Sequence, residues 1–343
     1  MKTTKEKVLE YLKDNNRAYV SGQEIADSLY MTRASVWKAI KALQNEGYEI
    51  DGVSNRGYRL IISADSLNKS AIDKIVSSNG IELETYLFDE TESTNDRAKE
   101  LAEAGKRSLV VISDYQSKGR GRRGRTFYSP KGAGLYMSFL MDTGIEAAKA
   151  AKLTAMAAVA VCRAIDRILE EISSNRGNTA NSEAFCNPKI KWVNDIYLGD
   201  KKICGILTEG FSSLEEGSSS NVIVGIGINI YQPKDGFPEE IKKTAGVLLP
   251  NGYSENDLRN RLCAYVILEL IGLHNSNNTS FIEEYRKRSM LIGNYVRINQ
   301  FNENQNNKYA KVLGIDDECR LMVEYDDKKT EYLSSGEVSV VKY

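Results

Sequence analysis

The period of the apolar residues changes twice along the chain, and this change constrains the fold more than any other feature. Over residues 1–62, apolar side chains recur every three or four positions, as in amphipathic helices. From about 71 to 285, strand patterns alternate with long helical patterns. After Gly293 only strand patterns remain, separated by polar turns. We therefore predict an α+β protein of three domains, which suits a length of 343 residues.

The first segment predicts three helices. Thr3 with Glu6 and Ser21 with Glu24 fit the capping box, in which each side chain satisfies the other residue's backbone N–H at a helix start. Thr32 follows a short turn and is a good N-cap for the third helix. A short turn between two capped helices is typical of a helix-turn-helix.

The remaining segments predict one mixed domain and one β domain. Residues 147–171 predict a single long helix, and the Ser/Asn-rich segment 173–187 predicts an exposed loop. Strands are predicted at 108–112, 134–140, 190–192, 203–208 and 221–230. Four more strands, at 295–298, 309–313, 321–325 and 338–341, predict a small β-barrel.

Composition excludes several classes of protein. No apolar run approaches the roughly 18 residues that a membrane span needs, and the first residues lack the apolar block of a secretory signal. We therefore expect a cytoplasmic protein with no membrane partner. The five cysteines form no CxxC pair, so we expect buried apolar side chains and not disulfides or zinc. The one histidine, His274, follows a helical apolar run and predicts a helix end at the surface, not catalysis.

The sharpest local feature is GRGRRGR at residues 119–125, with four arginines in seven positions. It contains G-x-G-x-x-G, but an extended stretch ending at Pro130 follows where a dinucleotide fingerprint requires a helix. What remains is a flexible loop whose guanidinium groups can neutralise phosphate or carboxylate, and which is expected to order around an anion. A nucleic-acid-binding patch or a solvated loop explains this segment equally well by itself.

Six sequence islands, the loop among them, follow one another in a defined order. They are Ser93-Thr94-Asn95, the stretch from Gln116 to Arg125, Ser129-Pro130-x-Gly132, Lys191-Trp192-x-Asn194-Asp195, Lys202-x-x-Gly205-Ile206-Leu207-x-Glu209 and Gly225-Ile226-Gly227-Ile228-Asn229. In this order they resemble biotin protein ligases, and with the front domain the whole chain resembles a bifunctional biotin ligase and biotin operon repressor. Two positions depart from the family pattern: Val193 stands where proline is usual, and Phe127 where many relatives carry tryptophan.

The resemblance implies a domain plan and an activity. It implies a winged helix-turn-helix at 1–63, a linker at 64–69, a catalytic domain of class II synthetase-like fold at 70–288 and an SH3-like barrel at 289–343. The implied enzyme uses Mg²⁺ and forms biotinyl-5'-AMP from biotin and ATP. It then transfers biotin to a lysine of a biotin carboxyl carrier protein. The adenylate would double as corepressor, so that a homodimer binds operator DNA.

The resemblance also implies the site residues. Neutral polar groups suit the ureido ring of biotin, and positive charge is needed where its carboxylate meets the α-phosphate. Lys202 and Arg122 are the expected catalytic residues. The expected biotin site is Ser93, Thr94, Asn95, Gln116, Gly119, Arg120, Gly121, Arg122, Lys202 and Gly205, with apolar walls from Leu135, Tyr136 and Ile206. The expected ATP and adenylate site is Arg120, Arg122, Arg123, Arg125, Phe127, Asn194, Asp195 and Asn229.

Plainer interpretations of these residues remain open. Ser93 or Thr94 could cap a helix, and Lys202 could be a surface lysine after a hairpin turn. Asn194, Asp195 and Asn229 could orient phosphate oxygens or Mg²⁺, although Asp195 could equally pair with an arginine, and no metal ligand is assigned.

The front domain carries ten Lys/Arg against eight Asp/Glu in residues 1–62, so placement matters more than net charge. The expected DNA-binding residues lie off the apolar stripe of the third helix or on a wing at 48–60: Arg33, Ser35, Trp37, Lys38, Lys41 and Arg56. A module for dimerisation or protein contacts is the alternative. We expect Trp37 to pack at the domain's edge rather than to read a base.

Two other functions compete with the biotin ligase. One is a ligase for another acyl cofactor such as lipoate, which the arginine-rich loop disfavours. The other is a ligand-sensing repressor without catalysis, which the presence of Lys202 and the Gly/Arg loop disfavours.

Overall fold

The computed structural model describes residues 3–15, 19–45, 50–54, 56–60, 65–141, 150–175, 187–212, 220–249, 257–276, 279–299 and 308–341. The chain forms two compact units, Met1–Ser66 with Ser254–Asp257, and Leu67–Tyr253 with Leu258–Tyr343. Three predicted features fall wholly or partly outside the described residues: Cys186, Tyr48 of the wing, and most of the loop at 173–187.

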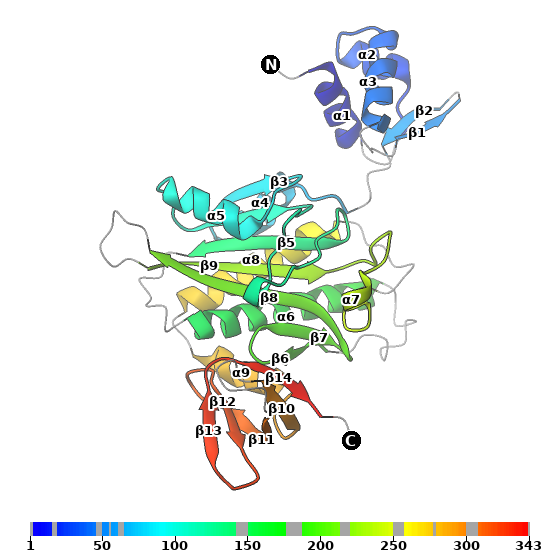
Figure 1. Cartoon of the computed structure of the whole chain (residues 1–343). Coiled ribbons are helices and arrows are strands. Elements are labelled where there is room, and N and C mark those ends of the chain that lie inside the picture. Colours follow the sequence, from blue (N-terminus) through cyan, green and yellow to red (C-terminus); the bar gives the residue numbers. More distant parts are fainter. Residues whose placement is uncertain are drawn as a thin grey trace. The chain divides into compact units, whose positions relative to one another are not determined.

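The smaller unit is a helix-turn-helix followed by a hairpin (Figure 1). Its elements are α1 (Thr4–Asp14), α2 (Gly22–Ser28), α3 (Arg33–Asn45), β1 (Ile50–Val53) and β2 (Gly57–Leu60), the two strands being antiparallel. The capping box of Thr3 and Glu6 is complete, and Ser21 accepts from the Glu24 N–H. The Thr32 hydroxyl accepts from the Ser35 N–H at 3.2 Å. The predicted caps therefore start the helices as expected.

A seven-stranded mixed sheet forms the centre of the larger unit. Its strands are β3 (Glu84–Phe88), β4 (Leu109–Ser113), β5 (Gly134–Met141), β6 (Lys189–Lys191), β7 (Asp195–Leu198), β8 (Lys201–Ser212) and β9 (Ser220–Asn229), in the order β3-β4-β5-β9-β8-β7-β6. Only β3 and β4 pair in parallel. The five predicted strands are confirmed with shifted ends, and the short strands β3 and β7 were not predicted.

Helices cover both faces of this sheet. They are α4 (Lys69–Ser78), α5 (Thr94–Glu103), α6 (Ala150–Asn175), α7 (Glu239–Lys242), α8 (Leu258–Asn275) and α9 (Ser280–Arg288). Two of them, α6 and α8, run along one face, and α5 packs on the other (Figure 1). The predicted long helix is confirmed as α6, which continues through 173–175 where a loop was predicted. The helix α4 begins at the last residue of the predicted linker.

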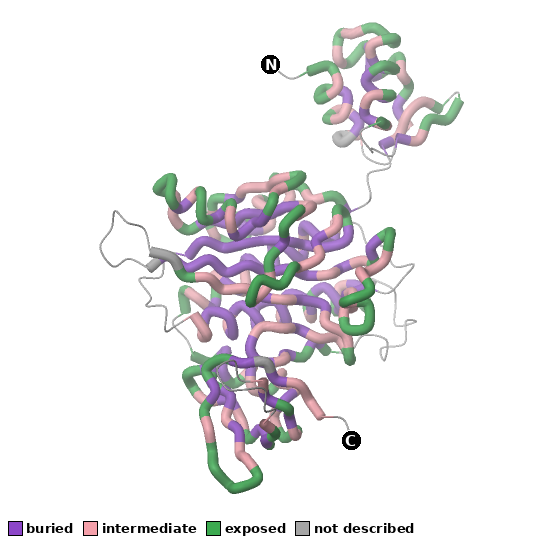
Figure 2. Tube along the Cα trace, in the orientation of Figure 1, coloured by how far each residue is buried: buried purple, intermediate pink, exposed green. Residues whose placement is uncertain are grey.

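Side chains of the central strands alternate between these two faces. On β5, Leu135, Met137 and Phe139 join the core beneath α6 and α8, whereas Leu140 packs against α5. Because both faces are covered, β5 is buried along its whole length (Figure 2). Leu135 therefore lies in the core and not on a binding wall.

A five-stranded antiparallel sheet ends the chain. Its strands are β10 (Tyr295–Asn299), β11 (Lys308–Ile315), β12 (Leu321–Glu324), β13 (Thr330–Leu333) and β14 (Glu337–Val340), in the order β13-β12-β11-β10-β14. The four predicted strands are confirmed, and β13 is additional. Buried residues such as Val296 and Val323 continue the core of the larger unit.

The four described cysteines are buried, as their pattern predicted, whereas His274 lies at the predicted helix end but is half-buried. Cys162, Cys204, Cys263 and Cys319 are buried free thiols. Burial raises the pKa of the Cys319 thiol to about 12. His274 lies in the last turn of α8, where burial lowers its pKa. Among the described helices, none combines the length and apolar character needed to cross a bilayer.

Candidate active site

One cavity of about 390 Å³ lies within the larger unit, on the sheet face that α5 covers. Of the residues predicted for biotin or ATP, all but Gly119 and the expected apolar walls Leu135 and Tyr136 line it. Gly119 instead allows the close approach of two backbone segments within the loop, because a Cβ there would lie 2.4 Å from the Phe127 carbonyl oxygen. The structure thus brings together residues that are up to 136 positions apart, from Ser93 to Asn229.

Three glycines form the floor of the cavity. Gly205 on β8 pairs with Gly227 on β9, and the Phe127 ring rests on this pair. A Cβ at Gly227 would lie 2.5 Å from the ring, and one at Gly225 would lie 2.2 Å from Asn95 Oδ1. Both positions therefore exclude larger residues because side chains of the site rest on them.

A hydrogen-bonded polar corner stands beside that floor. Gln116 Oε1 accepts from the Thr94 N–H at 2.9 Å and from the Thr94 hydroxyl at 3.1 Å. Ser138 Oγ, fully buried on β5, lies 2.6 Å from both Thr94 Oγ1 and Asn95 Oδ1. Ser93 caps α5 by accepting from the Asp96 N–H, so its capping role coexists with its place in the cavity.

The Gly/Arg loop is compact. The Gly121 N–H donates to the Arg125 carbonyl at 2.7 Å, and the Phe127 N–H donates to the Gly119 carbonyl at 2.8 Å. Between them Arg122–Gly124 form a single 3-10 turn, in which Arg123 has a φ of 62°. We predicted a flexible loop that orders around an anion. In the structure, the carboxylates of Asp96 and Glu209 supply negative charge to Arg120 of the loop.

The arginines of the loop have different partners. Arg120 pairs with Asp96 at 2.7 Å and with Glu209 at 2.9 Å. Arg122 donates at 3.0 Å to the side-chain oxygen of Asn194, a neutral acceptor, and Asn194 in turn donates to the Ile206 carbonyl. The charge of Arg122 is therefore less neutralised than that of Arg120.

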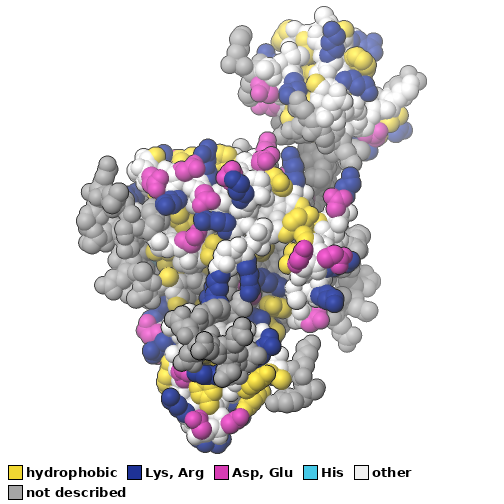
Figure 3. Space-filling view, in the orientation of Figure 1, with side chains coloured by type: hydrophobic (Ala, Val, Ile, Leu, Met, Phe, Trp, Pro, Cys, Tyr) yellow, Lys and Arg dark blue, Asp and Glu magenta, His cyan; other side chains and the backbone are white. Residues whose placement is uncertain are grey.

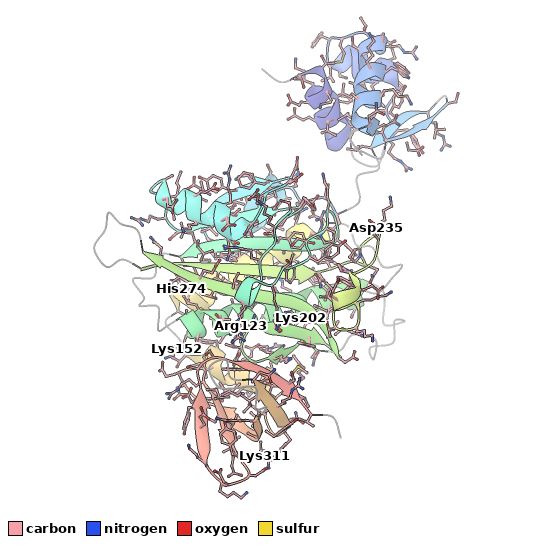
Figure 4. All side chains as sticks on the ribbon, in the orientation of Figure 1. Arg123, Lys152, Lys202, Asp235, His274 and Lys311 are labelled. Carbon is pink, nitrogen blue, oxygen red and sulfur yellow. The ribbon has the colours of Figure 1, made fainter. Side chains whose placement is uncertain are left out.

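Lys202 lies across the cavity floor from the loop. The predicted hairpin turn is present at Gly199, whose φ is 59°, and it places Lys202 at the start of β8. Lys202 Nζ lies 2.6 Å from Asp195 Oδ1, so Asp195 pairs with a lysine and not with an arginine. Lys202 and Arg123, labelled in Figure 4, both line the cavity.

Sequence reasoning missed a second wall of the cavity. Phe237, Ile241 and Ala245 line one side, and Val338 and Ser339 of β14 line another. No motif marks these residues, because they come from segments that only the fold brings to the cavity. Of the predicted apolar walls, Ile206 lines the cavity, whereas Tyr136 contacts the Phe127 ring edge to face at 6.4 Å.

The segment before Asn194 is held by the C-terminal part of the chain. Trp192 Nε1 donates to the Cys319 carbonyl at 2.9 Å, and the buried Tyr285 hydroxyl donates to the Val193 carbonyl at 2.9 Å. The Trp192–Val193 peptide bond is cis. The two hydrogen bonds, from Trp192 and from Tyr285, fix the backbone that presents Asn194 and Asp195 to the cavity.

Charged side chains of both signs lie over this part of the larger unit (Figure 3). In the described part of the chain, no group of three His, Cys, Asp or Glu side chains could hold a metal ion. Asp195 supplies a single carboxylate that already faces Lys202. One carboxylate is too few to hold Mg²⁺ alone. The site therefore fits Mg²⁺ only if the phosphate oxygens of a bound nucleotide supply further ligands.

The smaller unit exposes most of the residues predicted to bind DNA. Arg33, Lys38 and Lys41 of α3 are exposed, and Ser35 is half-buried beside the Thr32 hydroxyl. Trp37 is 51% exposed, so about half of its surface is covered by the rest of the unit. On the hairpin, the exposed Arg56 guanidinium carbon lies 6.0 Å from the centre of the Tyr19 ring.

Comparisons with known proteins agree with this geometry. Sequence models match residues 4–59 as an HTH domain, 87–229 as the Biotin/lipoate A/B protein ligase family and 291–341 as the Biotin protein ligase C terminal domain. The chain is 32% identical over 327 residues to the Bifunctional ligase/repressor BirA of Bacillus spizizenii, covering 94% of each chain. It is 26% identical over 326 residues to that of Escherichia coli, covering 95% of this chain and 94% of that protein.

A solved structure is also similar. The biotin protein ligase from Aquifex aeolicus, in complex with biotin and ATP, is 25% identical with a TM-score of 0.56, and the match covers 76% of this chain and 99% of that one. The matches to full-length relatives span the helix-turn-helix, the cavity and the C-terminal sheet together. The chain therefore belongs to the biotin protein ligase family, among its bifunctional ligase/repressor members.

Proposed function

We propose that this protein forms biotinyl-5'-AMP from biotin and ATP and then transfers the biotin to a lysine of a biotin carboxyl carrier protein. The observation that carries the proposal is the single cavity in which a neutral polar corner, Arg122 and Lys202 face the same space. A neutral ring with polar edges and two anions are the ligands that such a lining suits.

The polar corner suits the ureido end of biotin. Thr94, Asn95 and Gln116 supply neutral donors and acceptors. The buried Ser138 fixes Thr94 and Asn95, and Thr94 in turn donates to Gln116. Their mutual hydrogen bonds preorganise the corner before the ligand arrives. Ile206 and the glycine floor leave room for the apolar body of biotin beside it.

Arg122 and Lys202 suit the point where the two substrates react. The biotin carboxylate attacks the α-phosphate of ATP, a P–O bond forms, and pyrophosphate leaves. Both reactants are anions, so fixed cations lower the barrier by stabilising the charge as it converges. The carrier lysine amine then attacks the acyl carbon of the adenylate, and AMP leaves.

Phe127, Asn194, Asp195 and Asn229 suit the nucleotide. The Phe127 ring can stack on adenine, and the amide oxygens with Asp195 can orient the triphosphate and the Mg²⁺ that accompanies it. Magnesium would shield phosphate charge at this place. Arg123 and Arg125 add positive charge along the same rim.

The proposal includes a repressor activity. Residues 1–63 would bind operator DNA, 70–288 would hold the cavity and 289–343 would complete its edge. The exposed cationic positions of α3 suit a major groove, and those of the hairpin suit phosphates. Two half-sites would be bound by a homodimer that forms with the adenylate as corepressor. This scheme implies a cytoplasmic protein, because operator DNA and ATP must both be present.

One assay tests the ligase. The full chain is incubated with biotin, ATP, Mg²⁺ and a carrier domain, and the mass of the carrier is measured. We expect the carrier to gain one biotinyl group only when ATP is present, and lipoate to give no gain. A carrier that gains lipoyl groups would support the other ligase class, and no gain with either acid would support the non-catalytic repressor.

A second assay tests the repressor. Binding of the full chain to DNA from its own promoter region, and its sedimentation, are measured with and without biotin plus ATP. We expect tighter binding and a larger mass when both are present. The variant with Lys38→Ala and Lys41→Ala should lose DNA binding and keep ligation, whereas equal affinity of this variant and the parent would remove α3 from the DNA interface.

A further inference from the structure

Two carboxylates hold the Gly/Arg loop through one arginine. Asp96 comes from the first turn of α5, and Glu209 comes from β8, 89 residues beyond Arg120. One nitrogen of Arg120, Nη2, lies 2.7 Å from Asp96 Oδ1 and 2.9 Å from Glu209 Oε2. Arg120 therefore ties the loop to a helix and to a strand at the same time.

Glu209 extends this connection to the polar corner. The same oxygen, Oε2, accepts from Asn95 Nδ2 at 2.6 Å. The other side-chain atom of that amide, Asn95 Oδ1, lies 2.6 Å from Ser138 Oγ. The position of the loop is thus linked, bond by bond, to the groups that suit the ureido ring.

The charges argue against a role for Arg120 in binding an anion directly. One guanidinium faces two carboxylates, so the Asp96–Arg120–Glu209 cluster carries a formal charge of −1 and does not attract a carboxylate or a phosphate. Arg122 contacts a neutral amide oxygen instead. Two arginines of one loop therefore have different tasks: Arg120 fastens the loop, and Arg122 faces the ligand.

We propose that Asp96 and Glu209 are positioning residues that hold residues 119–125 at the cavity through Arg120, and so set how long the adenylate stays bound. The part about the adenylate rests on the proposed ligase function. The part about the loop does not, because its position can be measured without any ligand.

Trypsin offers the direct test, because the loop carries four arginines and Asp96→Asn or Glu209→Gln leaves all of them in place. We compare cleavage rates within 119–125 in the full chain without ligand. The matched control is Glu92→Gln, which removes the exposed ion pair between Glu92 and Lys118 near the base of the same loop. We expect cleavage to rise roughly two- to fivefold in Asp96→Asn and in Glu209→Gln, and to stay at the parent rate in the control.

The same variants are then loaded with biotin and ATP, and the dissociation rate of the adenylate is measured. We expect dissociation to quicken by a similar factor, with the single-turnover rate of adenylate formation changed less. An unchanged melting temperature shows that each variant is folded, and having two separate carboxylate variants guards against the failure of one to fold.

Two results would overturn the proposal. Cleavage of both Asp96→Asn and Glu209→Gln at the rate of Glu92→Gln would show that the ion pairs do not hold the loop. Slower loss of the adenylate in Glu209→Gln would show that Glu209 competes with the ligand for Arg120. If no adenylate forms in the parent protein, the proposed function fails, while the cleavage comparison still decides whether Asp96 and Glu209 hold the loop through Arg120.

Discussion

The two faces of the seven-stranded sheet are built from the same strands but differ in composition. Toward α6 and α8, neighbouring strands present large apolar residues such as Met137 and Ile228, which are buried in one core. Toward α5, the adjacent positions Ser138, Gly225 and Gly227 are small or polar. One face stabilises the fold, and the other leaves the cavity in which we propose that substrates bind.

This contrast has a simple physical cause. Because successive residues of a strand point to opposite faces, one position can be optimised for packing while its neighbour is kept small. At the Gly205–Gly227 pair, missing side chains give the Phe127 ring a flat support. The account therefore predicts that substitutions separate by face: those on the cavity face change activity, and those on the helix face change stability.

Lys202→Ala should give the largest effect on the cavity face. It removes the cation beside the reacting carboxylate and phosphate, so we expect adenylate formation to slow by roughly 10²–10³-fold, the range found when a single preorganised donor is lost. Biotin affinity should fall much less, because Lys202 acts mainly on the charge of the transition state. Single-turnover kinetics and biotin titration measure the two quantities, and equal losses in both would make Lys202 a simple binding residue.

Arg122→Ala should give the next effect. Loss of one charge-assisted contact of about 1.5–3 kcal/mol corresponds to adenylate that leaves roughly 10- to 100-fold faster. The fold should persist, because Arg122 contacts Asn194 at the cavity and is not part of the buried core. Chase experiments with unlabelled adenylate measure the rate, and a rate equal to that of the parent would remove Arg122 from the ligand site.

His274, on the helix side, should give the smallest effect, and only on stability. Burial lowers its folded pKa below the ordinary 6.5, so the unfolded chain binds the proton first as the pH falls. The stability that neutral His274 supports is present above pH 6.5 and is lost as the pH falls through the folded pKa. His274→Gln should reduce the loss of unfolding free energy on acidification by less than about 1 kcal/mol, because the side chain is only partly buried. Denaturant titrations between about pH 7 and 5 measure it, and adenylate formation at pH 7 should not change.

The sequence predicted the parts of the site that carry unusual local composition. The Gly/Arg loop stands out by its charge, and Lys202 follows the turn that Gly199 makes. Caps at Thr3 and Thr32 were predictable because they depend on residues three positions away. Such local signals also explain why the long helix and the strands of the central sheet were found.

Other parts depend on contacts between distant segments and could not be predicted. Ser138 stands in an apolar strand, where a single serine is indistinguishable from a tolerated core residue. Glu209 was part of a recognised island, but its partner Asn95 is 114 residues away. Phe237 and Ser339 line the cavity only because the fold brings their segments to it. The pairing of Asp195 with Lys202 likewise required the register of β7 against β8.

Comparing Gly227→Ala with Ile228→Val tests the separation of the two faces most directly, because these neighbours on β9 point to opposite sides and Ile228 does not line the cavity. The measurement is the single-turnover rate of adenylate formation, taken with the unfolding free energy of each variant. We predict that Gly227→Ala displaces the Phe127 ring and slows the reaction by about tenfold or more, with little loss of stability. Ile228→Val should cost about 0.5–1.5 kcal/mol of stability and leave the rate unchanged. A full rate in Gly227→Ala, or a slow reaction in Ile228→Val, would contradict the account.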